Sequence, residues 1–234
     1  MSITDNLVAL EQRIDSACAR AGRNRADVTL VAVTKTRTPS DVDEAIAAGI
    51  THIGENRVQE AATKKPQVTL PAKWHLVGSL QTNKAKKALE LFDFIQSIDS
   101  PRLALELQRR CEQIGRMVSV LVEVNTSAEP AKHGVQPDAV PDLVAEVLKL
   151  YRLQLAGLMT IGPGLAIENP EASRPCFEIL RILAEDCRRR LDIPLPHLSM
   201  GMSSDFEVGI EEGATMVRIG AAIFGPRPAS PKPD

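Results

Sequence analysis

The sequence has 234 residues, of which 44% are hydrophobic, and a formal net charge of −2 at pH 7. This is enough material for one sizeable core, and a barrel of this length commonly forms a single domain. Aromatic residues make up only 3% of the chain, and the basic clusters lie in segments with helical spacing, so we expect no nucleic-acid binding. No apolar run approaches the length of a membrane span, and the four cysteines include no CxxC pair. We therefore expect a cytoplasmic protein with free thiols and no membrane contact.

The chain begins with a predicted helix that Thr4 or Asp5 can cap and that Gly22 ends, because apolar residues recur between them at helical spacing. From there, short apolar runs predict eight strands, near residues 28, 51, 73, 94, 117, 154, 196 and 215. Amphipathic segments between the strands predict helices in "DVDEAIAAG", "VQEAATKK", "QTNKAKKALELF", "RLALELQRRCEQIG", "DAVPDLVAEVLKL", "ASRPCFEILRILAEDCRRRL" and "SDFEVGIEEG".

Regular alternation of strands and helices is typical of parallel strands joined by crossover helices. We predict a single (β/α)8 TIM-type barrel over residues 1–225 with an extra N-terminal helix, followed by a proline-rich, disordered tail at residues 226–234. An open, doubly wound sheet is the alternative, but the glycine spacing of a dinucleotide-binding fold is missing.

Lys35 follows the apolar run of the first predicted strand within two residues. One interpretation is a surface lysine that opens a loop. The other is an amine held for covalent chemistry, because a partly buried lysine loses its proton more easily and becomes a nucleophile.

Two later segments carry the features of a phosphate site. "MGMSSD", after the seventh strand, offers glycine flexibility, the hydroxyls of Ser203 and Ser204, and the start of a helix. "RIGAA", at the end of the eighth strand, brings the backbone amides of Gly220 and Ala221 near the same place, where many barrels bind phosphate. Simple capping of the helix by Ser203 or Ser204 is the alternative.

An amine after the first strand and a phosphate cradle after the seventh and eighth strands suit one ligand in particular. Pyridoxal 5′-phosphate (PLP) has an aldehyde that forms a Schiff base with lysine and a phosphate that anchors its other end. We therefore expect PLP as the cofactor, bound through Lys35.

The sequence also resembles the PLP homeostasis protein family, whose barrel recurs as the N-terminal domain of alanine racemase. The matching segments span nearly the whole chain: "VAVTKT", "GENRVQE", "WHLVGSLQTNK", "LVEVNTSAEPAKHG", "GLMTIGP", "HLSMGMSSDFEVGIEEGATMVRIG" and "AAIFG". The resemblance implies that Lys35 carries the cofactor, that Asn56 lies near its ring and that Arg218 faces the pyridine nitrogen. It also implies that Ser203 and the amides around Gly220 hold the phosphate.

Family membership further implies a carrier or buffer of PLP for vitamin B6 homeostasis without an established catalytic activity, with apo-forms of PLP-dependent enzymes as partners. Two residues depart from the family pattern. Arg57 replaces an aromatic residue after "GEN", and Ala221 replaces a hydroxyl residue after "VRIG". The second change removes a phosphate donor, for which Ser204 could compensate.

The alternatives are enzymes. An amino-acid racemase needs a second acid–base group beside the lysine. The only tyrosine, Tyr151, precedes the sixth strand and so falls at the wrong end of a barrel, which leaves His133. A sugar-phosphate aldolase would also use a lysine Schiff base, but it would be colourless. The histidines have no metal-binding spacing, so we expect no metal site.

Overall fold

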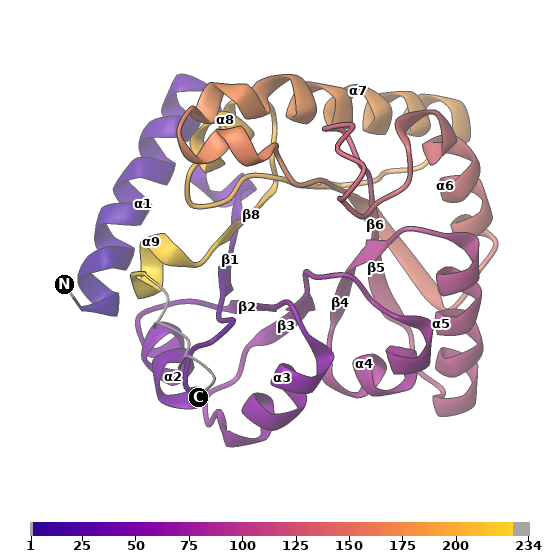
Figure 1. Ribbon diagram of the computed structural model, residues 1–234, viewed down its shortest axis with the longest axis horizontal. Helices are drawn as coiled ribbons and strands as arrows, with labels where there is room; N and C mark the ends of the chain where they lie inside the picture. Colours follow the sequence, from indigo (N-terminus) through magenta and orange to yellow (C-terminus); the bar gives the residue numbers. More distant parts are fainter. Residues whose placement is uncertain (1, 227–234) are drawn as a thin grey trace.

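The computed structural model describes residues 2–226, and these form a closed barrel of eight parallel strands. Each strand pairs with the next along the chain, and β8 pairs with β1 to close the barrel (Figure 1). The strands are β1 (Thr29–Val33), β2 (His52–Glu55), β3 (Lys73–Leu76), β4 (Phe94–Ile98), β5 (Val118–Glu123), β6 (Leu153–Met159), β7 (His197–Ser199) and β8 (Met216–Ile219). The prediction of a (β/α)8 barrel is confirmed, and the open sheet is wrong.

Helices surround the barrel as an outer ring (Figure 1). They are α1 (Ile3–Arg20), α2 (Pro39–Ala47), α3 (Val58–Lys64), α4 (Ala85–Leu91), α5 (Pro101–Ile114), α6 (Val140–Leu148), α7 (Arg174–Leu191), α8 (Phe206–Glu211) and α9 (Ala221–Phe224). The predicted extra N-terminal helix is α1, which precedes β1 and packs against α8 and α9 where the barrel closes.

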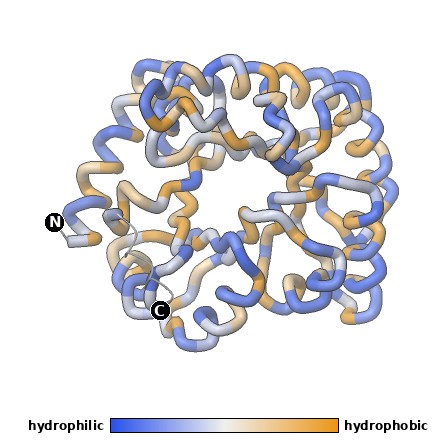
Figure 2. Tube along the Cα trace, in the orientation of Figure 1, coloured by the Kyte–Doolittle hydropathy of each residue, from blue (hydrophilic) through white to orange (hydrophobic). Residues whose placement is uncertain are grey.

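The strands sort their side chains by the two-residue period of an extended chain. Along β3 and β8, the outward residues Trp74 and Val217 join the large hydrophobic core between the strands and the helices. Along the outer helices, hydrophobic and hydrophilic residues alternate (Figure 2), as amphipathic helices on a barrel require. A separate, smaller cluster inside the barrel contains Leu121, Met159 and Met216.

Two predicted helix starts need correction. Ser2, and not Thr4 or Asp5, caps α1, because its hydroxyl accepts from the amide of Asp5 while the Asp5 carboxylate accepts from the amide of Ser2. The segment "SDFEVGIEEG" becomes helical only at Phe206, since residues up to Asp205 form a turn. The predicted tail, apart from Pro226, lies outside the described residues, and the predicted domain limits stay a prediction.

Candidate functional site

Lys35 lies two residues beyond the end of β1, at the carboxyl end of the barrel, and its side chain is half-buried. The next residue, Thr36, has a φ of 65°, a left-handed conformation that a β-branched residue rarely adopts. The amide of Thr36 donates to Glu60 Oε1 at 2.5 Å. The chain therefore turns sharply directly after Lys35, and this turn holds the lysine at the mouth of the barrel.

Lys35 lines a cavity of about 360 Å³ at this end of the barrel. All seven residues predicted for the site line it: Lys35, Asn56, Ser203, Ser204, Arg218, Gly220 and Ala221. They come from the carboxyl end of β8 and from the segments that follow β1, β2, β7 and β8, so the closure of the barrel, and not sequence proximity, brings them together.

The loop between β7 and α8 is shaped by Asp205, which is buried. Its carboxylate accepts from the amide of Met202 at 2.7 Å and from the hydroxyl of Ser173 at 2.5 Å. Neither Ser203 nor Ser204 caps α8, because Asp205 directly precedes the helix. The alternative of simple capping is therefore wrong, and both serine residues line the cavity instead.

The chain after β8 comes close to β1. A Cβ atom at Gly220 would lie 3.0 Å from the carbonyl oxygen of Val33, so a side chain there would require a small shift of the backbone at the end of β1. Ala221 starts α9, and its amide therefore has no intrahelical partner. The amide of Ala222 donates to Ser203 Oγ at 3.4 Å, which joins this segment to the β7–α8 loop. Hydroxyl and amide donors thus meet at one end of the cavity.

Arg218 lies at the bottom of the cavity and is buried. Its guanidinium donates to Ser199 Oγ at 2.6 Å and to the carbonyl oxygen of Thr160 at 2.7 Å. Burial lowers the pKa of Arg218 to about 10, although the carboxylates of Asp205 and Glu123 oppose the shift. The side chain therefore stays cationic near neutral pH and can only donate hydrogen bonds.

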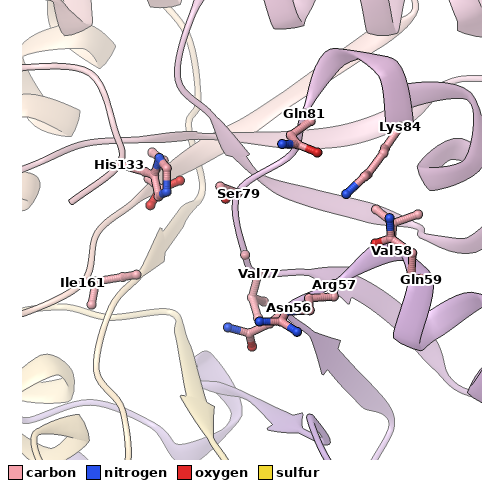
Figure 3. A pocket seen from close by; sticks show the side chains of 12 residues that line it. Asn56, Arg57, Val58, Gln59, Val77, Ser79, Gln81, Lys84, His133 and Ile161 are labelled. Carbon is pink, nitrogen blue, oxygen red and sulfur yellow. The ribbon is translucent and has the colours of Figure 1, made fainter. Parts of the chain in front are cut away.

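A second pocket of about 440 Å³ adjoins the first and shares Asn56, Val77 and Ile161 with it. Figure 3 shows Lys84 and His133 on opposite sides of this pocket. Its lining includes Glu123, the last residue of β5, whose side chain is buried and whose Oε2 has no hydrogen-bond partner. Burial raises the pKa of Glu123 to about 7, against the opposing effect of Arg218.

Sequence reasoning missed two charged residues of these pockets. Arg37, two residues after Lys35, lines the first cavity and donates to the carbonyl oxygens of Gly225 and Pro226. Glu123 was hidden at the end of the strand "MVSVLVEV", although its inward position in the strand period was a usable signal.

The remaining polar candidates lie elsewhere. Tyr151 is exposed before β6, at the amino-terminal end of the barrel, and its hydroxyl donates to Glu112. His52 and His197 begin β2 and β7 at that same end. Within residues 2–226, no group of three or more histidine, cysteine, aspartate or glutamate residues could hold a metal ion. Across the same range, no helix has the length and apolarity needed to cross a membrane. All four cysteines are free and buried, as expected.

Comparisons with known proteins show the family of this chain. The family model of the alanine racemase N-terminal domain matches residues 6–228. A pyridoxal phosphate homeostasis protein of Aquifex aeolicus is 43% identical over 228 residues, which are 97% of this chain and 99% of that protein. The protein of the same name in Escherichia coli is 39% identical over 238 residues, covering 98% of this chain and 99% of its own length.

Among solved structures, PipY of Synechococcus elongatus PCC7942 with PLP bound superposes with a TM-score of 0.83 at 36% identity, covering 96% of this chain and all of PipY. An alanine racemase of Clostridium difficile shares the fold alone, with a TM-score of 0.75, 15% identity, and coverage of 97% of this chain but only 58% of the racemase. The chain therefore belongs to the alanine racemase N-terminal domain family, within which its full-length relatives are pyridoxal phosphate homeostasis proteins.

Proposed function

We propose that this chain binds PLP in the cavity at the carboxyl end of its barrel and carries or buffers the cofactor for vitamin B6 homeostasis. The observation that supports this most directly is the common lining of one cavity by Lys35, Ser203 and Arg218. The relatives named for PLP homeostasis, and the PipY structure with PLP bound, support the same ligand.

Different residues of the cavity bind different parts of the cofactor. Lys35 would supply the amine that condenses with the PLP aldehyde, with release of water. Ser203, Ser204 and the amides of Gly220 and Ala221, which line the other end of the cavity, would hold the phosphate. Arg218 would offer its remaining donors to the pyridine nitrogen, with Asn56 beside the ring.

The donor at the pyridine nitrogen limits the chemistry. PLP supplies an electron sink for reactions at the α-carbon of amino acids, and the sink is strongest when its ring nitrogen is protonated. A guanidinium cannot accept a proton, so Arg218 keeps that nitrogen unprotonated. This favours holding the cofactor over transforming amino acids with it. Ala221 is exposed at the cavity wall, so solvent and recipient proteins have access to the phosphate end.

The experiment is an absorption spectrum of the purified protein with added PLP, followed by borohydride reduction and peptide mapping. We expect a yellow protein whose reduced tag lies on Lys35. Lys35→Ala should lose the tag but keep the fold, and it should retain weak binding through the phosphate. Lys84→Ala is the matched control, because Lys84 lines only the adjoining pocket. A tag on Lys84 or Lys132 would show that the assignment is wrong.

The carrier role has its own test. The PLP-loaded protein is incubated with an apo-form of a PLP-dependent enzyme, and recovery of enzyme activity is compared with that produced by the same amount of free PLP. Transfer supports a carrier. If no apo-enzyme regains activity, the chain sequesters the cofactor instead. Location in the cytoplasm stays a prediction.

The second candidate function is an amino-acid racemase, and one observation favours it. Glu123 and His133 line the adjoining pocket, where either could serve as the second acid–base group. Tyr151 cannot, since it lies at the other end of the barrel. Incubation of the loaded protein with L-alanine in heavy water separates the two functions. Rapid incorporation of deuterium at the α-carbon with loss of optical purity, dependent on Lys35, would establish the racemase.

A further inference from the structure

A continuous chain of hydrogen bonds runs through the inside of the barrel, from the amino-terminal end to the cavity. Its members occupy inward positions on strands β2, β3, β4, β7 and β8, and their successive contacts measure 2.8, 2.9, 2.6 and 2.6 Å. In order, they are His52, His75, Gln96, Ser199 and Arg218. The middle three are buried completely, so water does not compete for their bonds.

The direction of every bond follows from Arg218. A guanidinium only donates, so Ser199 Oγ accepts from it, and the single proton of Ser199 goes to Gln96 Oε1. The amide nitrogen of Gln96 then faces His75 Nδ1 and must donate to it.

The bond to Gln96 fixes the neutral tautomer of His75 with its proton on Nε2. That proton is donated to Nδ1 of His52, which has to be unprotonated. The hydrogen-bond chain therefore begins with a donor, Arg218, and ends with an acceptor, His52.

We propose that His75, Gln96 and Ser199 are positioning residues that couple the protonation state of His52 to the orientation of Arg218 at the cofactor ring. The inference rests on the proposed function, because it takes PLP as the group that Arg218 meets. Its basis is the arrangement itself, in which no member can change its hydrogen-bonding state without forcing a change in the next.

Uptake of one proton from solvent by His52 reverses the chain. His52 then carries a proton on both ring nitrogens, so His75 has to accept at Nε2 and hold its own proton on Nδ1. The side-chain amide of Gln96 turns over to accept from His75 and donates to Ser199. Ser199 Oγ now receives donors from both sides, and its proton loses its acceptor. The oxygen can accept both bonds, but its hydroxyl has to rotate to a new direction, and the lone pair that Arg218 meets rotates with it. The guanidinium therefore changes its orientation relative to the ring.

The surroundings of His52 and His75 favour the neutral form of both imidazole rings. Burial lowers the pKa of His52, charges on Lys73 and His197 lower it further, and Asp93 opposes the shift. Burial also lowers the pKa of His75, so this ring stays neutral. The titratable groups around the chain are Lys73, His75, Asp93 and His197 near His52, with Glu11 and Arg25 across a small pocket, and Glu123 and Asp205 near Arg218.

The structure supplies an internal control. His197 lies at the same end of the barrel and is also partly buried, and burial lowers its pKa as well. Its Nδ1 meets Thr215 Oγ1 at 3.4 Å, so it stands outside the chain. A long-range charge effect would act from His52 and His197 alike, whereas the chain transmits only the state of His52.

The first arm of the test uses the protein without cofactor. Nitrogen NMR of the histidine rings is followed from about pH 8 to about pH 5. We expect the proton of His75 to lie on Nε2 above the midpoint of His52 and on Nδ1 below it, and to ignore the midpoint of His197. If His75 keeps the same tautomer on both sides of the His52 midpoint, the proposal is overturned without recourse to any variant.

The second arm uses PLP as the probe. The absorption band of the loaded protein should show a pH step at the His52 midpoint in the wild type and in His197→Gln, but not in His52→Gln or Gln96→Leu. Linkage requires that PLP also shift the His52 midpoint, and we expect about 0.5 of a pH unit, a threefold change in proton affinity. An equal step in His52→Gln would overturn the coupling. If PLP fails to bind at all, the proposed function fails, while the first arm still decides whether the chain exists.

Discussion

The inside of the barrel and the shell between the barrel and its helices are both buried, but they are built from different residues. The shell is the larger core and is almost wholly apolar, with Trp74, Phe92 and Phe177 among its largest side chains. Inside the barrel, a small apolar cluster around Met159 and Met216 is interrupted by histidine, glutamine, glutamate and arginine. One strand serves both regions, because alternate residues point to opposite faces.

This difference indicates that the shell stabilises the fold and that the inside of the barrel carries the functional groups. Apolar contacts in the shell stabilise the packing of the helices against the strands. The polar interior contributes less to the burial of apolar surface, and each of its groups needs a partner because a buried polar group without one is costly. Partners inside the barrel come from several strands, so one substitution there can leave a group on another strand without its hydrogen bond.

The largest effect should come from a cavity in the shell. Phe177 on α7 is fully buried, and Phe177→Ala should lower the free energy of unfolding by about 3–5 kcal/mol. Ile182→Ala on the same helix is the matched control, since that side chain is 51% exposed. Urea unfolding measures both. The PLP absorption band of folded Phe177→Ala should match the wild type, and a displaced band would mean that the two regions are not separable.

One buried ion pair, between Lys64 and Glu55, is an exception to the apolar composition of the shell. Lys64 Nζ contacts Glu55 Oε1 at 2.6 Å and the carbonyl oxygen of Thr34 at the same distance, and both charged side chains are buried. Lys64→Met leaves the carboxyl of Glu55, whose pKa is already raised by burial, without its counter-charge. We expect a loss of at least about 3 kcal/mol in the free energy of unfolding.

The double variant Glu55→Met/Lys64→Met controls for the volume of the pair. It should recover part of the stability that the single variant loses, because Glu55 no longer leaves a buried carboxyl without its counter-charge. Recovery is not complete, since Glu60 and the carbonyl oxygen of Thr34 still lose the Lys64 amine. Urea unfolding of the two variants side by side decides the matter. Equal losses would mean that packing, and not charge, governs this site.

Inside the barrel, Glu123 should make the free energy of unfolding depend on pH. Its pKa is raised to about 7 by burial, so the folded protein holds this proton at pH values where the unfolded chain has lost it. An unfolded glutamate has its ordinary pKa of 4.5. The stability that the protonated Glu123 contributes is therefore complete below about pH 4.5 and is lost as the pH rises through about 7.

Glu123→Gln removes this titration. At pH 8 the variant should be more stable than the wild type by about 1–3 kcal/mol, and at pH 4 the two should be nearly equal. The measurement is urea unfolding at both pH values. Glu90→Gln, on the surface of α4, is the control and should not gain stability at pH 8. A Glu123→Gln variant without a pH-dependent gain would contradict the raised pKa.

How much of this molecule was predictable depends on whether the signal is local. The eight strands were found because each is a short apolar run, and the cavity was found because special residues follow those runs at the carboxyl end of a barrel. The cap of α1 was misplaced by a few residues, since Ser2, Thr4 and Asp5 are all good capping residues and only the backbone geometry decides between them.

The interior hydrogen-bond chain was not predictable in the same way. His75, Gln96 and Ser199 come from three different strands, and nothing in the sequence of any one strand points to the other two. Only the barrel register, which places all three on the inner face, makes them neighbours. A usable signal exists for two of them, because His75 and Ser199 take inward positions whose neighbours along the strand are apolar, whereas Gln96 stands beside Ser97.

The smallest predicted effect concerns Ala221, at the mouth of the interior. Ala221→Ser restores a hydroxyl beside Ser203 and Ser204 at the phosphate end, and one hydrogen bond to a charged oxygen should tighten PLP binding about fivefold, or ~1 kcal/mol. Titration of the absorption band measures the affinity. Ala222→Ser is the matched control, because the Ala222 side chain packs against the hydrophobic core and its amide already donates to Ser203. Unfolding by urea should be unchanged in Ala221→Ser, since the residue is exposed and belongs to neither core. An equal gain in both variants would mean that the added hydroxyl acts through α9 as a whole, and the phosphate would then have to be sought elsewhere in the cavity.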